Sequence, residues 1–223
     1  SGFRVVLIDL DPQRSATLMM GLGGERNLPN VHQLIVEDLP VSRSLTVLES
    51  NLAMIAGSEL MAPAETWLAS QMAREQILTK RLESLRADFV IMDTSPAFSL
   101  VNINALVYAS EVWVPITTDY LALMGLKHFQ ETIGQVETEL GHPLPIRYVI
   151  PTFYDDRPLN TGAIMDALQQ KLGPENITTP IHSSVRVKEA ASRKLTILDH
   201  DPRNRVAQDF QVLIQRIGKD SAS

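Results

Sequence analysis

Short apolar runs alternate along the chain with longer stretches in which apolar residues recur every three or four positions. Several short runs are apolar throughout, which is typical of strands covered on both faces of a sheet. Recurrence every three or four residues instead predicts helices with one buried face. The predicted strands comprise residues 4–9, 52–56, 89–93, 111–116 and 146–152, with a shorter one near 177–181. The predicted helices comprise residues 64–86, 121–140, 160–172 and 205–217.

Alternating strands and helices indicate right-handed βαβ units, and hence an α/β fold with a mostly parallel sheet flanked by helices on both faces. We find no internal repeat, low-complexity segment or linker, so residues 1–223 are predicted to form one domain. The chain is 44% apolar and 21% charged, which is ordinary for a soluble globular protein. Residues 21–40 are the expected mobile loop.

Composition excludes several kinds of site. The chain has no cysteine, so disulfides, thiolate-bound metals and cysteine-bound iron–sulfur clusters are excluded. Its five histidines include no pair three or four residues apart, which argues against a histidine metal site. No apolar run approaches the roughly 18–20 residues of a spanning helix, so we predict no membrane span.

Charge is unevenly distributed along the chain. The formal net charge is −6, but residues 181–219 contain eight Lys or Arg and only four Asp or Glu, a balance of +4. The remainder therefore carries −10. A basic end on an acidic body is the pattern of a local anion-binding face, although solvated helix faces produce the same imbalance.

Two predicted strands end in carboxylates. The run VVLIDLDPQ ends at Asp9 with Asp11 close behind, and FVIMDTSP ends at Asp93. Ligands of parallel α/β sheets bind at the carboxyl ends of the strands, where a carboxylate can hold Mg²⁺ or orient a water toward a phosphate. The alternative is that each acid caps the helix that follows it.

Five segments resemble motifs of the ParA/MinD-type ATPases, the deviant-Walker branch of the P-loop NTPases, and most closely the Soj-like ParA partition proteins. VVLIDLDPQRSAT resembles the switch motif, an apolar strand followed by D-x-D-P-Q-G-N-A-T. FVIMDTSP resembles the Walker B strand, which usually ends D-x-P-P, with Ser95 at the first proline. Three further segments resemble motifs of the family and follow in the family's order. They are NALVYASEVWVPITTDYLALMGL, FYDDRPLNTG and SSVRVKEAASRKLTILDHDPRNRVAQDF. The resemblance covers nearly the whole chain and implies a P-loop NTPase fold.

One departure from the family pattern concerns phosphate binding. The family's loop K-G-G-x-G-K-[ST] belongs just before Gly2, and no G-x-x-x-x-G-K-[ST] occurs in the 223 residues. We therefore expect the 223-residue sequence to be incomplete at its N-terminus and to lack the family's first strand, phosphate loop and first helix. The alternative is a protein that has lost ATP binding. Without the loop, the chain is not expected to hydrolyse ATP at a useful rate.

The resemblance implies ATP and Mg²⁺ as cofactors and assigns roles around them. Asp11 matches the catalytic acid that positions the attacking water. Asp93 matches the Walker B acid that binds Mg²⁺ through water, and Asp9 matches an acid close to the Mg²⁺ shell. Adenine contacts are implied for residues 152–154 and 181–185, where Phe153 and Ser183 are the nucleotide-binding candidates.

The same resemblance implies DNA binding. Arg157 and Arg186 match two arginines through which ParA dimers bind DNA without sequence preference, and Lys188 extends the basic segment around Arg186. Such backbone contacts give affinity without base reading. Alternatively, the arginines form internal ion pairs with acids such as Asp156 or Glu189.

The function implied is that of a ParA-type partition ATPase in the cytoplasm, associated with the nucleoid. ATP binding would drive a homodimer that binds DNA non-specifically, and a ParB-like centromere-binding partner would stimulate hydrolysis to position a plasmid, chromosome or other cargo. Two alternatives remain: a MinD-like ATPase acting at a membrane through the amphipathic helix 205–217, and a non-catalytic scaffold.

Overall fold

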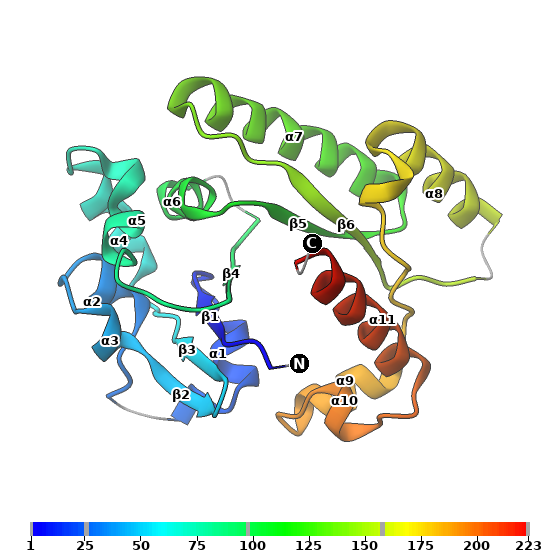
Figure 1. The fold of residues 1–223 in the computed structure, drawn as a ribbon, viewed down its shortest axis with the longest axis horizontal. Helices are drawn as coiled ribbons and strands as arrows, with labels where there is room; N and C mark the ends of the chain where they lie inside the picture. The colour runs from blue at the N-terminus through cyan, green and yellow to red at the C-terminus, as the bar shows by residue number, and fades with distance from the viewer. Residues whose placement is uncertain (1, 25–26, 97–98, 157–158, 222–223) are drawn as a thin grey trace. The chain divides into compact units, whose positions relative to one another are not determined.

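The computed structural model describes residues 2–24, 27–96, 99–156 and 159–221 (Figure 1). The chain divides into two compact units, Ser1–Ala109 and Ser110–Ser223. Each unit is a sheet with helices packed against it, so the predicted α/β class is confirmed. The prediction of a single domain over residues 1–223 stays a prediction.

The first unit contains a four-stranded sheet in the order β2-β3-β1-β4. Its strands are β1 (Val5–Asp9), β2 (Thr46–Glu49), β3 (Leu52–Ile55) and β4 (Phe89–Asp93). β1 pairs in parallel with both β3 and β4, and only β2 runs antiparallel. Along β1, Val6 and Ile8 are buried on one face of the sheet, and Val5 and Leu7 on the other face are half-buried.

Helices cover the sheet of the first unit with one continuous core. Val6 and Ile8 of β1 point into it, as expected from the two-residue period of a strand. Buried residues of α2, α3, α4, α5 and α6 complete this core. The helices of this unit are α1 (Ser15–Met19), α2 (Val31–Ile35), α3 (Val41–Ser44), α4 (Met61–Ala69), α5 (Ile77–Arg81) and α6 (Leu100–Tyr108), with 3₁₀ turns η1 (Leu22–Gly24) and η2 (Arg74–Gln76).

The second unit is a parallel pair of strands with helices on both faces (Figure 1). Its strands are β5 (Val112–Thr117) and β6 (Ile146–Thr152). Val149 of β6 packs under α7 and α8, whereas the neighbouring Tyr148 and Ile150 pack under α10 and α11. The helices are α7 (Tyr120–Leu140), α8 (Leu159–Leu172), α9 (Val185–Ser192), α10 (Ile197–His200) and α11 (Arg205–Asp220), with a 3₁₀ turn η3 (Pro174–Asn176).

The predicted helix over residues 64–86 is wrong in its continuity. α4 ends at Ala69, and the chain turns at Ala73, whose φ of 49° is left-handed and cannot continue a right-handed helix. Asn104 of α6 holds the new start, because it accepts from the Leu78 amide at 3.0 Å and donates to the Arg74 carbonyl at 2.8 Å. The hydrogen bonds of Asn104 therefore favour a break in the helix, although the spacing of apolar residues predicts a continuous one.

The predicted strand near residues 177–181 is also wrong. Within the described chain, this segment meets β6 at an isolated bridge between Val149 and Ile177 and through separate amide bonds from Thr178 and Ile181. Pro151 and Pro180 have no N–H to donate, so the ladder cannot run without interruption. Conversely, β2 was not predicted, because it is a four-residue edge strand with alternate residues exposed. Residues 21–40, the expected mobile loop, contain η1 and α2, and their mobility stays a prediction.

Candidate functional site

Two acids end neighbouring parallel strands in the same register. Asp9 of β1 lies opposite Asp93 of β4, and the Leu10 amide donates to the Asp93 carbonyl at 2.8 Å. The turn after β1 carries Asp11. The structure therefore brings together, at the carboxyl edge of one sheet, the three acids predicted from the sequence.

Asp9 is enclosed at this edge, with 0% of its surface exposed. One carboxylate oxygen, Oδ2, accepts from the Thr17 amide at 2.8 Å and from the Thr17 hydroxyl at 2.7 Å. The other oxygen, Oδ1, accepts from the Asp11 amide at 3.2 Å. The predicted contact of Asp9 with magnesium stays a prediction, and its partners in the structure are groups of the protein.

Asp11 lies in a tight turn and is partly exposed. Its carboxylate accepts from the Gln13 amide at 2.9 Å, and its carbonyl accepts from the Arg14 amide at 2.9 Å. Arg14 has a left-handed φ of 54°, at the position where the switch motif has glycine, and its guanidinium pairs with Glu59. A left-handed arginine costs free energy and persists only where surrounding contacts compensate for that cost, as the contacts of this turn do.

Asp93 is half-buried at the end of β4, close to the other two acids. Burial first, and then the negative charges of Asp9 and Asp11, raise the pKa of the Asp93 carboxyl above its ordinary value. A site that concentrates negative charge in this way fits a cation. Within the described residues, no three His, Cys, Asp or Glu side chains are arranged to hold a metal ion, so further ligands would have to come from elsewhere.

The loop after β4 is held from α6. Asn102 donates through Nδ2 to the Ser95 carbonyl at 2.7 Å and to the Ser95 hydroxyl at 3.4 Å. Glu65 of α4 accepts from the amides of Leu100 and Val101, both at 2.9 Å, and so caps the start of α6. Ser95, which departs from the family's proline, is therefore anchored by a side chain.

The two predicted nucleotide-contacting segments lie side by side in the second unit. The Tyr154 amide donates to the Ile181 carbonyl and the Ser183 amide donates to the Tyr154 carbonyl, both at 3.0 Å. Phe153 has a left-handed φ of 52° and is 67% exposed, so its ring faces away from the core. An exposed aromatic ring in a strained backbone position suits stacking against a planar ligand. The roles of Phe153 and Ser183 stay predictions.

Sequence analysis missed a histidine network beside these segments. His182 contacts Asp209 through Nδ1 at 2.8 Å and lies 3.6 Å from Asp156 through Nε2. Arg205 donates to Asp156 at 2.8 Å and so joins the same network. No spacing signal announces this network, because its members come from three separated segments.

Arg186 begins the basic segment on α9. Its side chain is 56% exposed and contacts Glu189 at 2.7 Å and Asp201 at 3.9 Å. The hydrogen bond from Arg186 lowers the pKa of Glu189. The internal ion pair proposed as an alternative is therefore present, while Lys188 lies exposed on the same helix. Arg157 lies outside the described residues. The DNA-binding assignments stay predictions.

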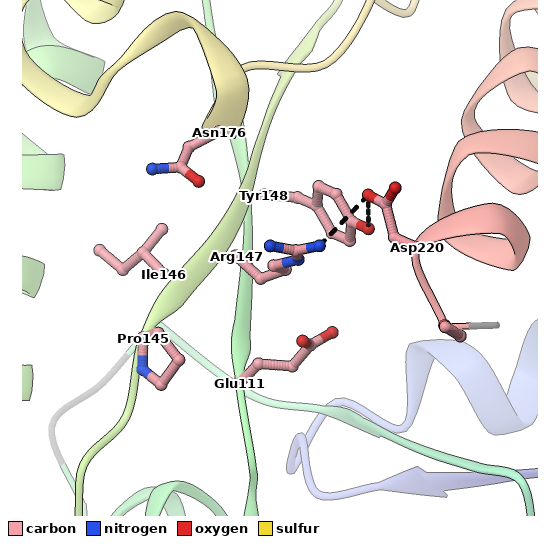
Figure 2. A pocket seen from close by; sticks show the side chains of 8 residues that line it. Glu111, Pro145, Ile146, Arg147, Tyr148, Asn176 and Asp220 are labelled. Carbon is pink, nitrogen blue, oxygen red and sulfur yellow. Dashed lines mark hydrogen bonds and ion pairs between the residues drawn. The ribbon is translucent and has the colours of Figure 1, made fainter. Parts of the chain in front are cut away.

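A pocket of about 420 Å³ lies at the amino end of the strands of the second unit (Figure 2). In it, the Tyr148 hydroxyl donates to Asp220 at 2.6 Å, and Arg147 lies 3.5 Å from the same carboxylate oxygen. Its lining comprises Glu111, Pro145, Ile146, Arg147, Tyr148, Asn176, Asp220 and Ser221. None of the predicted site residues is among them, so the pocket and the acidic edge are different features.

The last helix packs part of its apolar surface against its own unit. The amphipathic helix α11 buries Val206, Ala207 and Leu213 in the core of its own unit, with Phe210 and Ile217 packed beside them. Much of its apolar surface is therefore packed against protein, although Val212 and Ile214 are exposed. In the described part of the chain, no helix is long and apolar enough to cross a membrane.

Sequence comparisons find relatives over nearly the whole chain. The family profile AAA_31, described as an AAA domain, matches residues 1–146. The sporulation initiation inhibitor protein Soj of Bacillus subtilis is 31% identical over 97% of this chain and 87% of its own. The chromosome partitioning protein ParA of Caulobacter vibrioides is 27% identical over 97% and 83%, and the cell division protein PomZ of Myxococcus xanthus is 28% identical over 97% and 69%.

Solved structures share the fold. Cyanothece McdA without nucleotide superposes with a TM-score of 0.85 at 21% identity, over 99% of this chain and 88% of its own. A cobyrinic acid a,c-diamide synthase from Mycobacterium smegmatis, solved with an ATP analogue and magnesium, superposes with a TM-score of 0.72 at 29% identity, over 82% and 76%. The predicted P-loop NTPase-like fold is therefore confirmed.

Proposed function

We propose that this chain, which belongs to the ParA/MinD-type family of P-loop ATPases, is a partition ATPase of the ParA type whose acidic edge serves Mg-ATP. One observation carries the proposal: Asp9 and Asp93 end paired strands in register, with Asp11 in the turn beside them. Relatives named Soj and ParA support the partition role. The relative solved with an ATP analogue and magnesium supports the cofactors.

In this proposal, Asp11 and Asp93 have separate tasks. Asp93, whose pKa is raised by burial and by its neighbours' charges, gains from a cation that relieves the repulsion. Mg²⁺ is commonly held by one or two carboxylates plus substrate phosphates, which fits the partly exposed Asp93 better than a closed protein cage. Asp11 orients the attacking water, because its carboxylate is partly exposed and fixed by the Gln13 amide.

Hydrolysis also needs a phosphate-binding loop, because phosphoryl transfer depends on positioning and charge neutralisation around the phosphates. The 223 residues contain no such loop. We therefore expect the 223-residue chain alone to hydrolyse ATP at no more than background rate, and assign the activity to the full-length gene product, including any residues encoded ahead of Ser1.

For the second unit, the proposal is non-specific DNA binding by an ATP-bound homodimer, through Arg186, Lys188 and Arg157, with a ParB-like partner that stimulates hydrolysis. The exposed position of Arg186 and Lys188 on α9 supports it. We also propose a cytoplasmic, nucleoid-associated location, since such a dimer would collect on DNA.

The test measures DNA binding of the full-length gene product with ATP and with ADP at several salt concentrations. Tighter binding with ATP, falling steeply with salt, is expected. Asp11→Ala should lower the hydrolysis rate by about 10²–10⁴-fold while ATP still promotes DNA binding. Equal binding in both nucleotides would contradict the partition role, and a gene product that binds no ATP would favour the scaffold.

A further inference from the structure

Asp9 differs from the other two acids in its access to ligands. It has no exposed surface, whereas Asp11 and Asp93 are both partly exposed. A magnesium ion keeps several water molecules in its coordination shell, so a ligand or water-bridged ligand must be reachable from solvent. Asp9 is the least reachable acid at this edge.

Both oxygens of Asp9 are also engaged. Thr17 donates twice to Oδ2, through its amide and its hydroxyl, and the Asp11 amide donates to Oδ1. A carboxylate with three donors and no exposed surface is satisfied by the protein. A cation could bind Asp9 only after some of these bonds were broken.

The network continues from Thr17 to a third segment. Thr17 is itself buried, and its hydroxyl oxygen accepts from the Gly57 amide at 2.8 Å while the hydroxyl donates to Asp9. A Cβ atom built on Gly57 would lie 2.9 Å from Asp9 Cγ, so the backbone approaches the carboxylate closely. The chain of bonds therefore ties the end of β1 to α1 and to the segment after β3.

We infer that Asp9 is a positioning residue which, through Thr17 and the Asp11 amide, fixes the turn that carries the Asp11 carboxylate, and that it is not a ligand of the cation. The turn spans Asp11 to Arg14 and ends in a left-handed arginine, a conformation that persists only where surrounding contacts hold it. This inference rests on the proposed function, because the turn is held for hydrolysis.

The test compares Thr17→Val, which keeps the side-chain shape and removes the hydroxyl, with Thr17→Ser, which retains it. The first readout is amide hydrogen exchange at Gly57 in the full-length gene product without nucleotide or Mg²⁺. Thr17→Val should speed this exchange by about tenfold or more, whereas Thr17→Ser should leave it close to wild type, because only the valine removes the acceptor.

The second readout is the steady-state hydrolysis of ATP as Mg²⁺ is varied. Thr17→Val should lower kcat several-fold without moving the Mg²⁺ concentration of half-maximal rate, and Thr17→Ser should restore most of kcat. Asp9→Asn should likewise lower kcat without moving the half-maximal Mg²⁺ concentration. The side-chain NH₂ of the asparagine would replace one of the two acceptor oxygens and would face a backbone N–H.

Three results would overturn the inference. If Asp9→Asn raises the half-maximal Mg²⁺ concentration several-fold while Thr17→Val does not change kcat, Asp9 is a ligand. If Thr17→Val speeds exchange and leaves kcat unchanged, the network is structural only. If the unsubstituted protein neither binds nor hydrolyses ATP, the proposed function fails first, and the inference fails with it.

Discussion

Asp9 in the first unit and Arg186 in the second carry opposite charges and are held in opposite ways. Asp9 is enclosed and accepts hydrogen bonds from backbone amides and a buried hydroxyl. Arg186 is 56% exposed and pairs with the side chains of Glu189 and Asp201. The first arrangement has one low-energy position, because moving the carboxylate would leave buried donors without partners.

The second arrangement can be exchanged for another partner at small cost. Exposed ion pairs contribute about 0–1 kcal/mol, so Arg186 could leave Glu189 for a phosphate without a large loss of stability. The internal ion pair and the DNA-binding role are therefore compatible. If the proposed function holds, the comparison separates a group held rigidly near the proposed chemistry from one held loosely enough for a ligand to replace its partners.

The largest expected effect comes from crowding the enclosed acid. Gly57→Ala would place Cβ 2.9 Å from Asp9 Cγ and 3.0 Å from Arg14 Cγ, and the enclosed Asp9 has no exposed side on which to give way. We expect the free energy of unfolding to fall by about 1–3 kcal/mol, as measured by urea denaturation without nucleotide.

Gly134→Ala on α7 is the matched control in the second unit, because a Cβ there meets nothing within 4 Å. A helical Gly→Ala change should leave stability unchanged or raise it by up to about 1 kcal/mol. Equal effects of the two substitutions would show that Gly57 is not crowded, and the contrast between an enclosed and an open site would fail.

This contrast also explains how far the sequence could predict the site. The acid-ended strands were predictable, because continuous apolar runs of similar length bring their ends to one sheet edge, as Asp9 and Asp93 show. The burial of Asp9 could not be predicted from the sequence. Thr17 and Gly57, which enclose it, are 40 residues apart, and neither is charged or stands out in the spacing of apolar residues. Thr17 does occupy the threonine of the D-P-Q-G-N-A-T pattern, which is the one available signal.

The fold was likewise predictable where an element has its own apolar pattern, and not where its ends depend on contacts with distant residues. The helix over 121–140 follows from its apolar period, and β1, β3, β4, β5 and β6 follow from their apolar runs, whereas the edge strand β2 does not. The break at Ala73 was not, because it depends on hydrogen bonds from Asn104. The prolines at 151 and 180 were visible, and they would have argued against a continuous strand near 177–181.

The next expected effect is on the pH dependence of stability. It distinguishes an acid surrounded by like charges, Asp93, from an acid that accepts a hydrogen bond, Asp88. Burial, and then the charges of Asp9 and Asp11, raise the pKa of Asp93 in the folded protein. Its contribution to stability is therefore present below the ordinary aspartate pKa of about 3.9 and is lost as the pH rises through the raised folded value. Without cation, Asp93→Asn should gain stability relative to wild type across that window.

Asp88→Asn is the control of opposite sign. The Arg4 amide donates to Asp88 at 2.7 Å, and this bond lowers the pKa of Asp88. Its contribution is present above the ordinary pKa and is lost as the pH falls through the lowered value. Thermal unfolding of both variants from pH 3 to 7 measures the two trends, and parallel trends would contradict the crowding of Asp93.

The smallest effect on stability, and the sharpest on function, is expected from Glu189→Gln. The pair with Arg186 is exposed and contributes little to stability, so urea denaturation should barely change. DNA affinity of the full-length product with ATP should rise about two- to fivefold, because Arg186 loses its competing partner, while Arg186→Ala should weaken binding on all sequences alike.

Glu139→Gln on the exposed surface of α7 is the control, because it makes the same change in net charge at a different helix. If it raises DNA affinity as much as Glu189→Gln does, the gain comes from net charge and Arg186 is not a specific contact. If Arg186→Ala lowers stability without weakening DNA binding, the internal ion pair is the whole role of this arginine.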